Sequence, residues 1–281
     1  MSETTLPLAR RRARRLPPPS FIAGSLLLSF FFLAALAPQL LSPVDPLRID
    51  YLSILKPPSA AHWFGTDNLG RDILARTIHA ARIDLQIALF ATIPSVVIGT
   101  VVGAYVGYRG GIADAVFGQA VNLVITFPFL VLVIAIIAVL GPGLVNMYIA
   151  VGSVGWVFYG RITRAEILVQ REQDYAKAGR VLGYTHARIL FRHLLPNAAT
   201  PILTYWMTDM ALAILLGSSL GYLGLGAQPP TAEWGVLIAD GKNFMATAWW
   251  MSVFPGIAII IAGLGFSLTG DGVADWLRPK R

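Results

Sequence analysis

The chain has 281 residues, of which 56% are hydrophobic and only 13% are charged, whereas a soluble domain carries about 25% charged residues. It contains no cysteine, which excludes disulfides, thiolate metal sites and cysteine nucleophiles. The formal net charge of +7 does not by itself point to a nucleic acid, because in so apolar a chain the placement of Lys and Arg matters more than their sum.

Several apolar runs are about 20 residues long, which is enough for a helix to cross a bilayer, and they lack the alternating pattern of barrel strands. Unpaired backbone groups are costly in hydrocarbon, so the runs are expected to be helices. We therefore predict an all-α, polytopic membrane protein with six transmembrane helices in one domain, residues 21–281. The six runs cover about residues 21–41, 85–108, 115–140, 144–159, 202–225 and 249–268.

The first run follows five arginines within residues 10–15, so residues 1–20 are expected to be a basic cytoplasmic segment that contacts membrane lipid. Ala35, Leu36 and Ala37 imitate a signal-peptide cleavage site, and a removed leader is the alternative. The length of the run and the five runs after it favour a membrane helix.

Residues 42–84 are polar and are expected to form an external segment. The second run then carries Gly99, Gly103 and Gly107 at four-residue intervals. Small residues at this interval line one helix face and let another backbone approach closely. The alternative is that glycine is simply common in membrane helices. The third run ends at the breaker Gly141-Pro142-Gly143.

A polar stretch, residues 161–197, follows the fourth run. Its second part predicts two short amphipathic helices: the first carries Tyr175, Ala178, Val181 and Leu182, and the second carries Ala187, Leu190, Phe191 and Leu194. Gly183 is expected to separate them, Thr185 to cap the second, and Pro196 to end it. Such a pair suits a groove on a soluble partner, while the alternative is a basic linker on lipid headgroups.

Asp209 lies near the middle of the fifth run and is the only acidic residue inside the six expected spans. A carboxylate at this depth costs about 2.5–3.5 kcal/mol on insertion scales, so it should face the bundle interior, a partner or water. We expect Asp209 and Tyr205 to line a translocation path; a packing role is the alternative. Residues 226–248 then form an external loop before the last run.

The basic residues test this topology. With the N-terminus inside, the cytoplasmic pieces hold sixteen of the 22 Lys and Arg residues and the external pieces hold six. Because cytoplasmic loops are the more basic ones, both termini are expected to be cytoplasmic.

No catalytic constellation is evident. Gly241-Lys242-Asn243 resembles the end of a phosphate-binding loop, but Val236 stands where the earlier glycine is needed and Asn243 replaces the hydroxyl. The four histidines are not spaced as metal ligands within one helix turn. We therefore expect no enzyme activity, no metal site and no cofactor in this chain.

Several segments resemble a known family. The stretch Lys177-Ala178-Gly179, Gly183 and His193-Leu194-Leu195-Pro196 is similar in spacing to the coupling loop of ABC-importer permeases. His62 to Asp72 resembles the external signature of the C-type permease of dipeptide, oligopeptide and nickel importers. The same family is resembled by Leu220 to Gly226, Pro229-Pro230, Glu233-Trp234-Gly235, Phe254-Pro255-Gly256 and Gly270-Asp271-Gly272. Lys177 and Gly179 depart from the usual triplet, and Gly217 stands where an acidic residue is common.

The resemblance implies a type I ABC-importer fold in a bacterial inner membrane. It implies as partners a second related permease, two ABC ATPase subunits that bind ATP and Mg²⁺, and an extracytoplasmic substrate-binding protein, with no nucleic acid. The residues it assigns to ATPase coupling are Tyr175, Lys177, Ala178, Gly179, Leu182, Gly183, His193, Leu195 and Pro196. It assigns Gly65, Thr66, Asp67, Gly70, Arg71 and Asp72 to the external signature, either as structure or as a docking surface for the binding protein.

The expected cargo is a dipeptide or oligopeptide, and a nickel or other metal chelate is the alternative within the family. Two alternatives belong to other classes: an ion-coupled secondary transporter and a membrane scaffold without transport. Repeated halves and several intramembrane ionisable residues would favour the former, and no internal repeat is evident.

Overall fold

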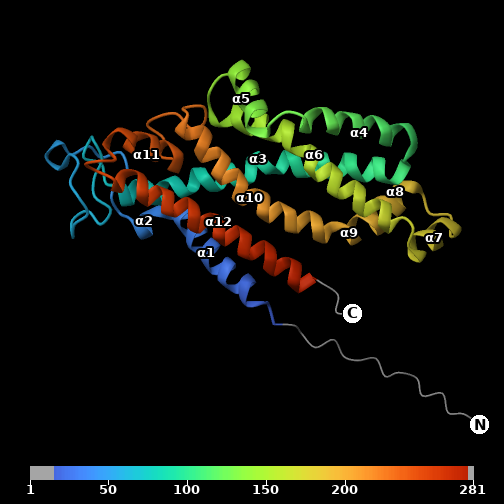
Figure 1. The fold of residues 1–281 in the computed structure, drawn as a ribbon. Coiled ribbons are helices and arrows are strands. Elements are labelled where there is room, and N and C mark those ends of the chain that lie inside the picture. The colour runs from blue at the N-terminus through green and yellow to red at the C-terminus, as the bar shows by residue number, and fades with distance from the viewer. Residues whose placement is uncertain (1–15, 278–281) are drawn as a thin grey trace, which may run out of the picture.

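Six helical passes run along the molecule in alternating directions (Figure 1). The structure, a computed structural model, describes residues 16–277, so the arginines at 10–15 and the basic tail after 277 lie outside the described residues. The passes are α1 (Pro19–Leu36), α3 (Ile73–Arg109), the pair α4 (Gly111–Ile125) and α5 (Phe129–Leu140), α6 (Leu144–Gln170), α10 (Ala199–Tyr222) and α12 (Trp250–Leu277).

Shorter elements connect these passes. They are α2 (Pro38–Leu41), α7 (Asp174–Val181), α8 (His186–Arg188), a π-helix (Ile189–Leu194), α9 (Leu195–Asn197), α11 (Trp234–Gly241) and the 3-10 turns Tyr51–Ser53 and Lys242–Phe244. Within residues 16–277 there is no β-strand, only an isolated bridge between Thr66 and Asp72. The all-α prediction is confirmed.

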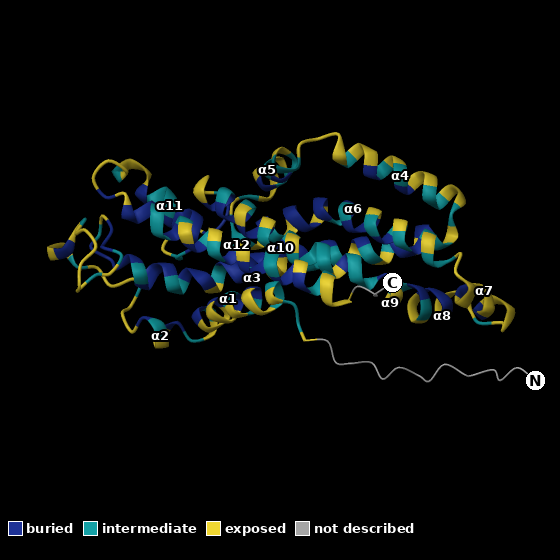
Figure 2. Cartoon of the chain, turned by 60° about the horizontal axis from the view of Figure 1, so that its bottom comes forward, coloured by how far each residue is buried: buried dark blue, intermediate teal, exposed yellow. Residues whose placement is uncertain are grey.

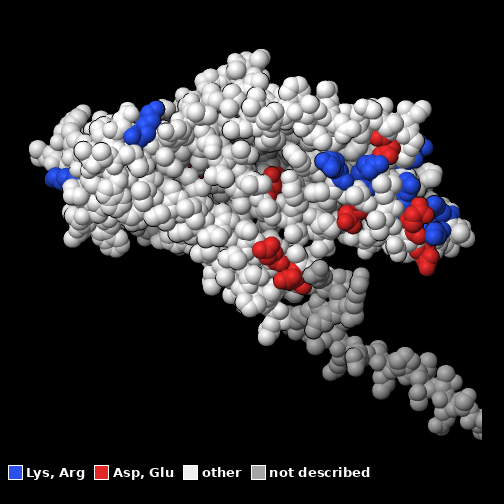
Figure 3. All heavy atoms as spheres, viewed as in Figure 1, with Lys and Arg blue, Asp and Glu red and all other residues white. Residues whose placement is uncertain are grey.

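Four of these helices, α1, α3, α10 and α12, are each long and apolar enough to cross a bilayer, and the bent pair α4–α5 can serve as a fifth crossing. The remaining pass, α6, has 27 residues, a length of about 40 Å at 1.5 Å per residue. This arrangement is consistent with the six predicted helices. Figure 3 shows a largely uncharged middle and a concentration of Lys, Arg, Asp and Glu at the end that carries α7 and α8.

The second membrane helix begins twelve residues earlier than expected, at Ile73 and not at 85. Its cap is Asp72, whose side chain accepts from the Ala75 amide at 2.8 Å. The polar character of residues 73–84 suggested a loop, but Arg76 and Asp84 are buried within the protein. The polar side chains of this segment pair with other buried groups instead of facing water. The helix can therefore start inside the expected external segment 42–84.

The third run is not one straight helix. Helices α4 and α5 meet at an angle of 86° across Thr126–Pro128, because proline lacks an N–H and disfavours the helical conformation of the residue before it. The fourth run is longer than expected and continues as α6 to Gln170. In this polar extension of α6, the guanidinium of Arg164 forms an ion pair with Asp114 of α4.

The glycine-based prediction for close packing is confirmed. A Cβ on Gly99 would lie 2.3 Å from the Trp156 carbonyl oxygen, and one on Gly103 would lie 2.4 Å from that of Gly160. Only a hydrogen at these positions lets the backbones of α3 and α6 touch. The two helices are therefore packed as one unit.

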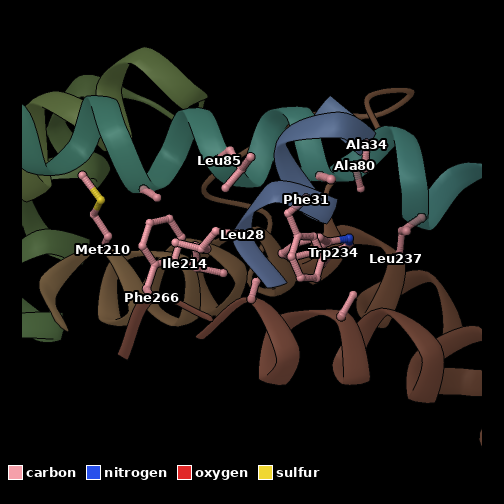
Figure 4. Packing of buried hydrophobic residues seen from close by; sticks show 14 residues of the cluster. Leu28, Phe31, Ala34, Ala80, Leu85, Met210, Ile214, Trp234, Leu237 and Phe266 are labelled. Carbon is pink, nitrogen blue, oxygen red and sulfur yellow. The ribbon is translucent and has the colours of Figure 1, made fainter. Parts of the chain in front are cut away.

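A core joins α1, α3, α10, α11 and α12 (Figure 4). Trp234 at the start of α11 is fully buried, contacts Phe31 of α1 edge-to-face at 5.5 Å, and donates from Nε1 to the Thr77 carbonyl at 2.9 Å. Figure 2 shows burial concentrated along α3, while α4 and α5 remain exposed over much of their surface. The loop 226–248 is thus attached to the helices through the buried side chain of Trp234.

Candidate functional sites

The loop 172–196 lies at the charged end of the molecule, beyond the end of α6 (Figures 1 and 3). The start of α1 and the end of α12 lie together, with the rings of Phe21 and Trp276 5.3 Å apart, and both point toward this end of the molecule (Figure 1). The described chain ends and the loop therefore lie on one side.

The local structure of this loop agrees with the sequence in most respects. Helix α7 is followed by Gly183 at φ +75°, a left-handed conformation that favours glycine. The Thr185 hydroxyl then accepts from the Arg188 amide at 3.3 Å and caps the second helix. The break and the cap were both predicted.

Pro196 does not end the second helix as predicted. It lies in α9, and a single turn residue, Ala198, separates α9 from α10. Proline is tolerated in the first turn of a helix because the amide it lacks has no intrahelical partner there. The preceding residues Ile189–Leu194 form a π-helix, so the loop continues directly into α10.

The inner face of the loop is fixed to the long helices. Ile189, Leu190 and Leu194 are buried against Ala104 of α3 and Ile167 of α6. Three hydrogen bonds add to this contact: Tyr108 Oη with His186 Nδ1 at 2.7 Å, Arg171 Nη1 with the Gly107 carbonyl at 2.8 Å, and Arg180 with the Arg171 carbonyl. A displacement of the loop must therefore move the ends of α3 and α6.

The outer face of the loop is apolar and unpaired within residues 16–277. Val181 and Leu182 are 88% and 68% exposed, and Ala178 is exposed beside Lys177. The stripe predicted for the first helix thus points away from the protein, while Ala176 and Gly179 face inward. The position of His193 is different: its ring stacks on Tyr184 at 5.6 Å, inside the loop. Tyr175 is half exposed and donates to Gln170, and burial raises the pKa of its hydroxyl.

At the opposite end of the molecule, the external signature forms a compact, hydrogen-bonded loop. Thr66 and Asp67 are residue types that favour a helix cap, but they lie in a loop that precedes α3. The Thr66 hydroxyl donates to the Ser53 carbonyl, and Asp72 takes the cap while also bonding His62 Nδ1 at 2.9 Å. These contacts stabilise the entry to α3.

A buried charge cluster lies at the centre of this loop. Asp67 Oδ2 accepts from Arg71 Nε at 2.6 Å and from Arg76 Nη1 at 2.8 Å, and Asp240 of α11 lies 3.3 Å from the same Arg76 atom. Asp67 is fully buried and Arg76 is 1% exposed. The cluster ties the external segment to α3 and α11.

The two signature glycines have backbone roles. Gly70 has φ +73°, and a Cβ there would lie 1.8 Å from the Asp50 carbonyl oxygen; Gly65 has the same φ and packs against the Trp250 indole. Arg71 is only 9% exposed. The geometry supports the structural role for this signature, and docking of a binding protein stays a prediction.

Asp209 lies at the seam of α10 and α6. Tyr159 of α6 donates its hydroxyl to Asp209 Oδ2 at 2.7 Å, and the Tyr159 ring contacts that of Tyr205 edge-to-face at 4.9 Å. The structure thus joins the two predicted path residues through a tyrosine that the sequence did not single out. The neighbouring Thr208 is exposed on the same helix.

Asp84 is a further acidic residue inside a long helix, and the sequence reading missed it. It was counted in the external segment because the start of α3 was placed too late. Asp84 is fully buried, and its Oδ2 accepts from the Trp234 amide at 3.1 Å. The signal that could have found it is the alternation of apolar residues with Arg76 and Asp84 at helical spacing after the Asp72 cap.

Comparison with known proteins gives a consistent result. Residues 83–281 match the family described as binding-protein-dependent transport system inner membrane component. The chain is 38% identical over 259 residues to the dipeptide transport system permease protein DppC of Alkalihalophilus pseudofirmus, covering 92% of this chain and 85% of the relative. It is 39% identical to the probable D,D-dipeptide permease DdpC of Escherichia coli (84% and 79% covered) and 34% identical to the glutathione permease GsiD of Pectobacterium atrosepticum (98% and 95%).

Proposed function

This chain belongs to the family of binding-protein-dependent transport system inner membrane components, and from that premise we propose that it is the C-type permease subunit of an ATP-driven importer of dipeptides or oligopeptides. It is a multi-pass inner membrane protein. The names of its relatives, which refer to dipeptides, D,D-dipeptides and glutathione, favour a peptide cargo over a metal chelate.

In the proposed assembly, this subunit pairs with a related permease to enclose the path. Two ATPase subunits bind ATP and Mg²⁺ on the cytoplasmic side, and an extracytoplasmic binding protein delivers the cargo. Both termini are cytoplasmic in this orientation. The subunit itself transmits motion and does not hydrolyse ATP.

The observation that carries the proposal is the construction of the loop 172–196. Its outer face presents Ala178, Val181 and Leu182 without a partner in the described chain, as a docking helix requires. Its inner face is bonded to the ends of α3 and α6. Closure of the ATPases would therefore move α3 and α6 together, because these two helices pack closely against each other through glycines.

The direct test is uptake of a labelled dipeptide by cells that express the subunit with its neighbouring importer genes. We expect uptake that requires the ATPase genes, and co-purification of the ATPase with the tagged subunit. Uptake that persists without the ATPases but collapses with the ion gradient would identify a secondary transporter. Absence of both uptake and co-purification would favour the alternative of a membrane scaffold without transport.

We also propose that Asp209 and Tyr205 line the path. Asp209 lies beside Thr208, which is exposed on the surface of α10. A carboxylate that faces lipid raises the free energy of the membrane-inserted state, so this surface is better placed toward a water-filled interface with the second permease. The Tyr159 hydroxyl fixes the carboxylate orientation. Cargo carrying an ammonium group would find a partner at this position.

Substitution Asp209→Asn is expected to slow peptide uptake about two- to tenfold, the equivalent of one ordinary hydrogen bond or charge contact of about 0.5–1.5 kcal/mol. Initial rates in cells with equal amounts of membrane-inserted subunit provide the measurement. Thr208→Val, an exposed neighbour without charge, is the matched control. Wild-type rates and peptide preference in Asp209→Asn would remove the path-lining role.

A further inference from the structure

Two acidic side chains meet in the interior at the external end of the helices. Asp84 comes from α3, and Glu233 comes from the residue immediately before α11; neither is exposed to solvent. Asp84 Oδ2 accepts from the amide of Trp234, the residue that follows Glu233 in the chain, so the two carboxyl groups are neighbours. Like charges in such contact repel, and burial makes both charges costly.

No cation compensates this pair. Within residues 16–277, neither carboxyl forms an ion pair with Lys, Arg or His. The partners of Asp84 are the Trp234 amide at 3.1 Å and the Ser218 hydroxyl at 3.4 Å. Glu233 accepts from the amides of Gly235 at 2.7 Å and Val236 at 2.9 Å. These donors can stabilise one negative charge, but two uncompensated charges at one buried point are expensive.

A carboxyl–carboxyl hydrogen bond needs a proton, because ionised carboxylates only accept. Burial raises the pKa of Glu233 above its ordinary value, in the direction that retains such a proton. We propose that Asp84 and Glu233 form a buried site that binds one proton, and that this proton holds the start of α11 against α3 and α10.

The packing around the pair shows what the proton would hold. A Cβ on Gly221 of α10 would lie 2.0 Å from Glu233 Oε2, and one on Gly235 would lie 1.9 Å from the Ser218 carbonyl oxygen. The start of α11 is therefore pressed onto the glycine–serine face of α10. Trp234, next to Glu233, continues this contact into the core beside Phe31 (Figure 4). Loss of the proton would leave two negative charges where the start of α11 packs against α10.

The other titratable groups near the pair are few. Tyr148 of α6 lies near Asp84, and Ser218 of α10 donates to the site. On α11, Asp240 pairs with Arg71 and Arg76, and these arginines are occupied by Asp67. From α1, the contact beside Trp234 is the apolar Phe31.

The sign of the pH effect follows from proton linkage. The folded protein holds a proton here that the unfolded chain releases near the ordinary carboxyl pKa of about 4. Stability is therefore favoured at lower pH and falls as pH rises toward the raised pKa of the folded pair. An amide at position 84 would donate to Glu233 at every pH and would remove this dependence.

The test compares the full-length subunit with Asp84→Asn in lipid nanodiscs between pH 6 and pH 9, by thermal unfolding. We expect the Tm of the wild-type protein to fall relative to Asp84→Asn by about 2–4 °C for each pH unit over which the folded pair keeps the proton that the unfolded chain has released. Asp271→Asn, which removes an exposed carboxyl from α12, is the matched control and should keep the wild-type slope.

Equal pH slopes for wild type and Asp84→Asn would overturn the proposal. Tyr148→Phe separates the phenol from the pair: a slope abolished by this variant would assign the proton to the tyrosine and also overturn it. If Asp84→Asn fails to fold, infrared spectroscopy of the wild type decides. A protonated carboxylic acid band that persists above the ordinary carboxyl pKa of about 4 supports the site, and a wild-type spectrum without such a band refutes it.

Discussion

Replacing Leu182 by glutamate is expected to abolish ATP-dependent uptake while leaving the subunit folded in the membrane. Leu182 is 68% exposed on the outer face of α7 and contributes nothing to the interior of the loop. A charge in the centre of a docking surface is left without water when the partner binds. A loss of about 2–4 kcal/mol, typical of an interface hot spot, weakens ATPase binding roughly 30- to 700-fold.

The measurement combines uptake with co-purification of the ATPase from the same membranes. Leu16→Glu is the matched control, since Leu16 is an even more exposed leucine and lies outside the loop. Because the chain has no cysteine, Ala178→Cys can be crosslinked without competing thiols. Normal uptake in Leu182→Glu, or crosslinks that never reach an ATPase, would contradict the docking role of this loop.

Substitution Asp67→Ala is expected to cause the largest loss of stability in the chain. It would leave Arg71 and Arg76 without their shared carboxylate, and Arg76 is 1% exposed. Removing one partner of a buried ion pair costs about 3–5 kcal/mol because the remaining charge has no solvent. Asp240 compensates only partly, since it is more distant from both guanidinium groups.

Thermal unfolding of the purified subunit and the yield of folded protein measure this loss. Asp45→Ala removes an exposed carboxyl that bonds only the Leu47 amide, and should change stability little. A Tm of Asp67→Ala within the range of Asp45→Ala would show that the cluster is dispensable. The double variant Asp67→Ala/Arg76→Met should recover part of the loss, because it removes one of the unpaired charges.

The candidate coupling loop was the part of the site most readable in the sequence. Its break at Gly183 and its cap at Thr185 depend on backbone conformation and on a neighbour three residues away. Such local effects are encoded in adjacent residues. The prediction for Pro196 is wrong because the proline lies in the first turn of α9, and α10 starts only three residues after it, which the local sequence does not show.

The path and proton sites were less readable. Asp209 was identified by its depth, but its partner Tyr159 lies 50 positions away, and no periodicity connects them. Asp84 and Glu233 are 149 positions apart by number. Their contact exists only because α3, α10 and α11 converge at one end of the bundle, a consequence of helix packing that no single segment specifies.

Composition and the apolar runs by themselves determined that the chain is helical, that it resides in a membrane and roughly where it crosses, because hydrocarbon permits little else. The glycine spacing also determined that α3 packs closely on a neighbour. Only the tertiary structure decided that this neighbour is α6, that α3 begins at Ile73, and that α4 and α5 bend. The physical reason is that buried polar residues such as Arg76 and Asp84 read as solvent-exposed until their partners, supplied by distant segments, are in place.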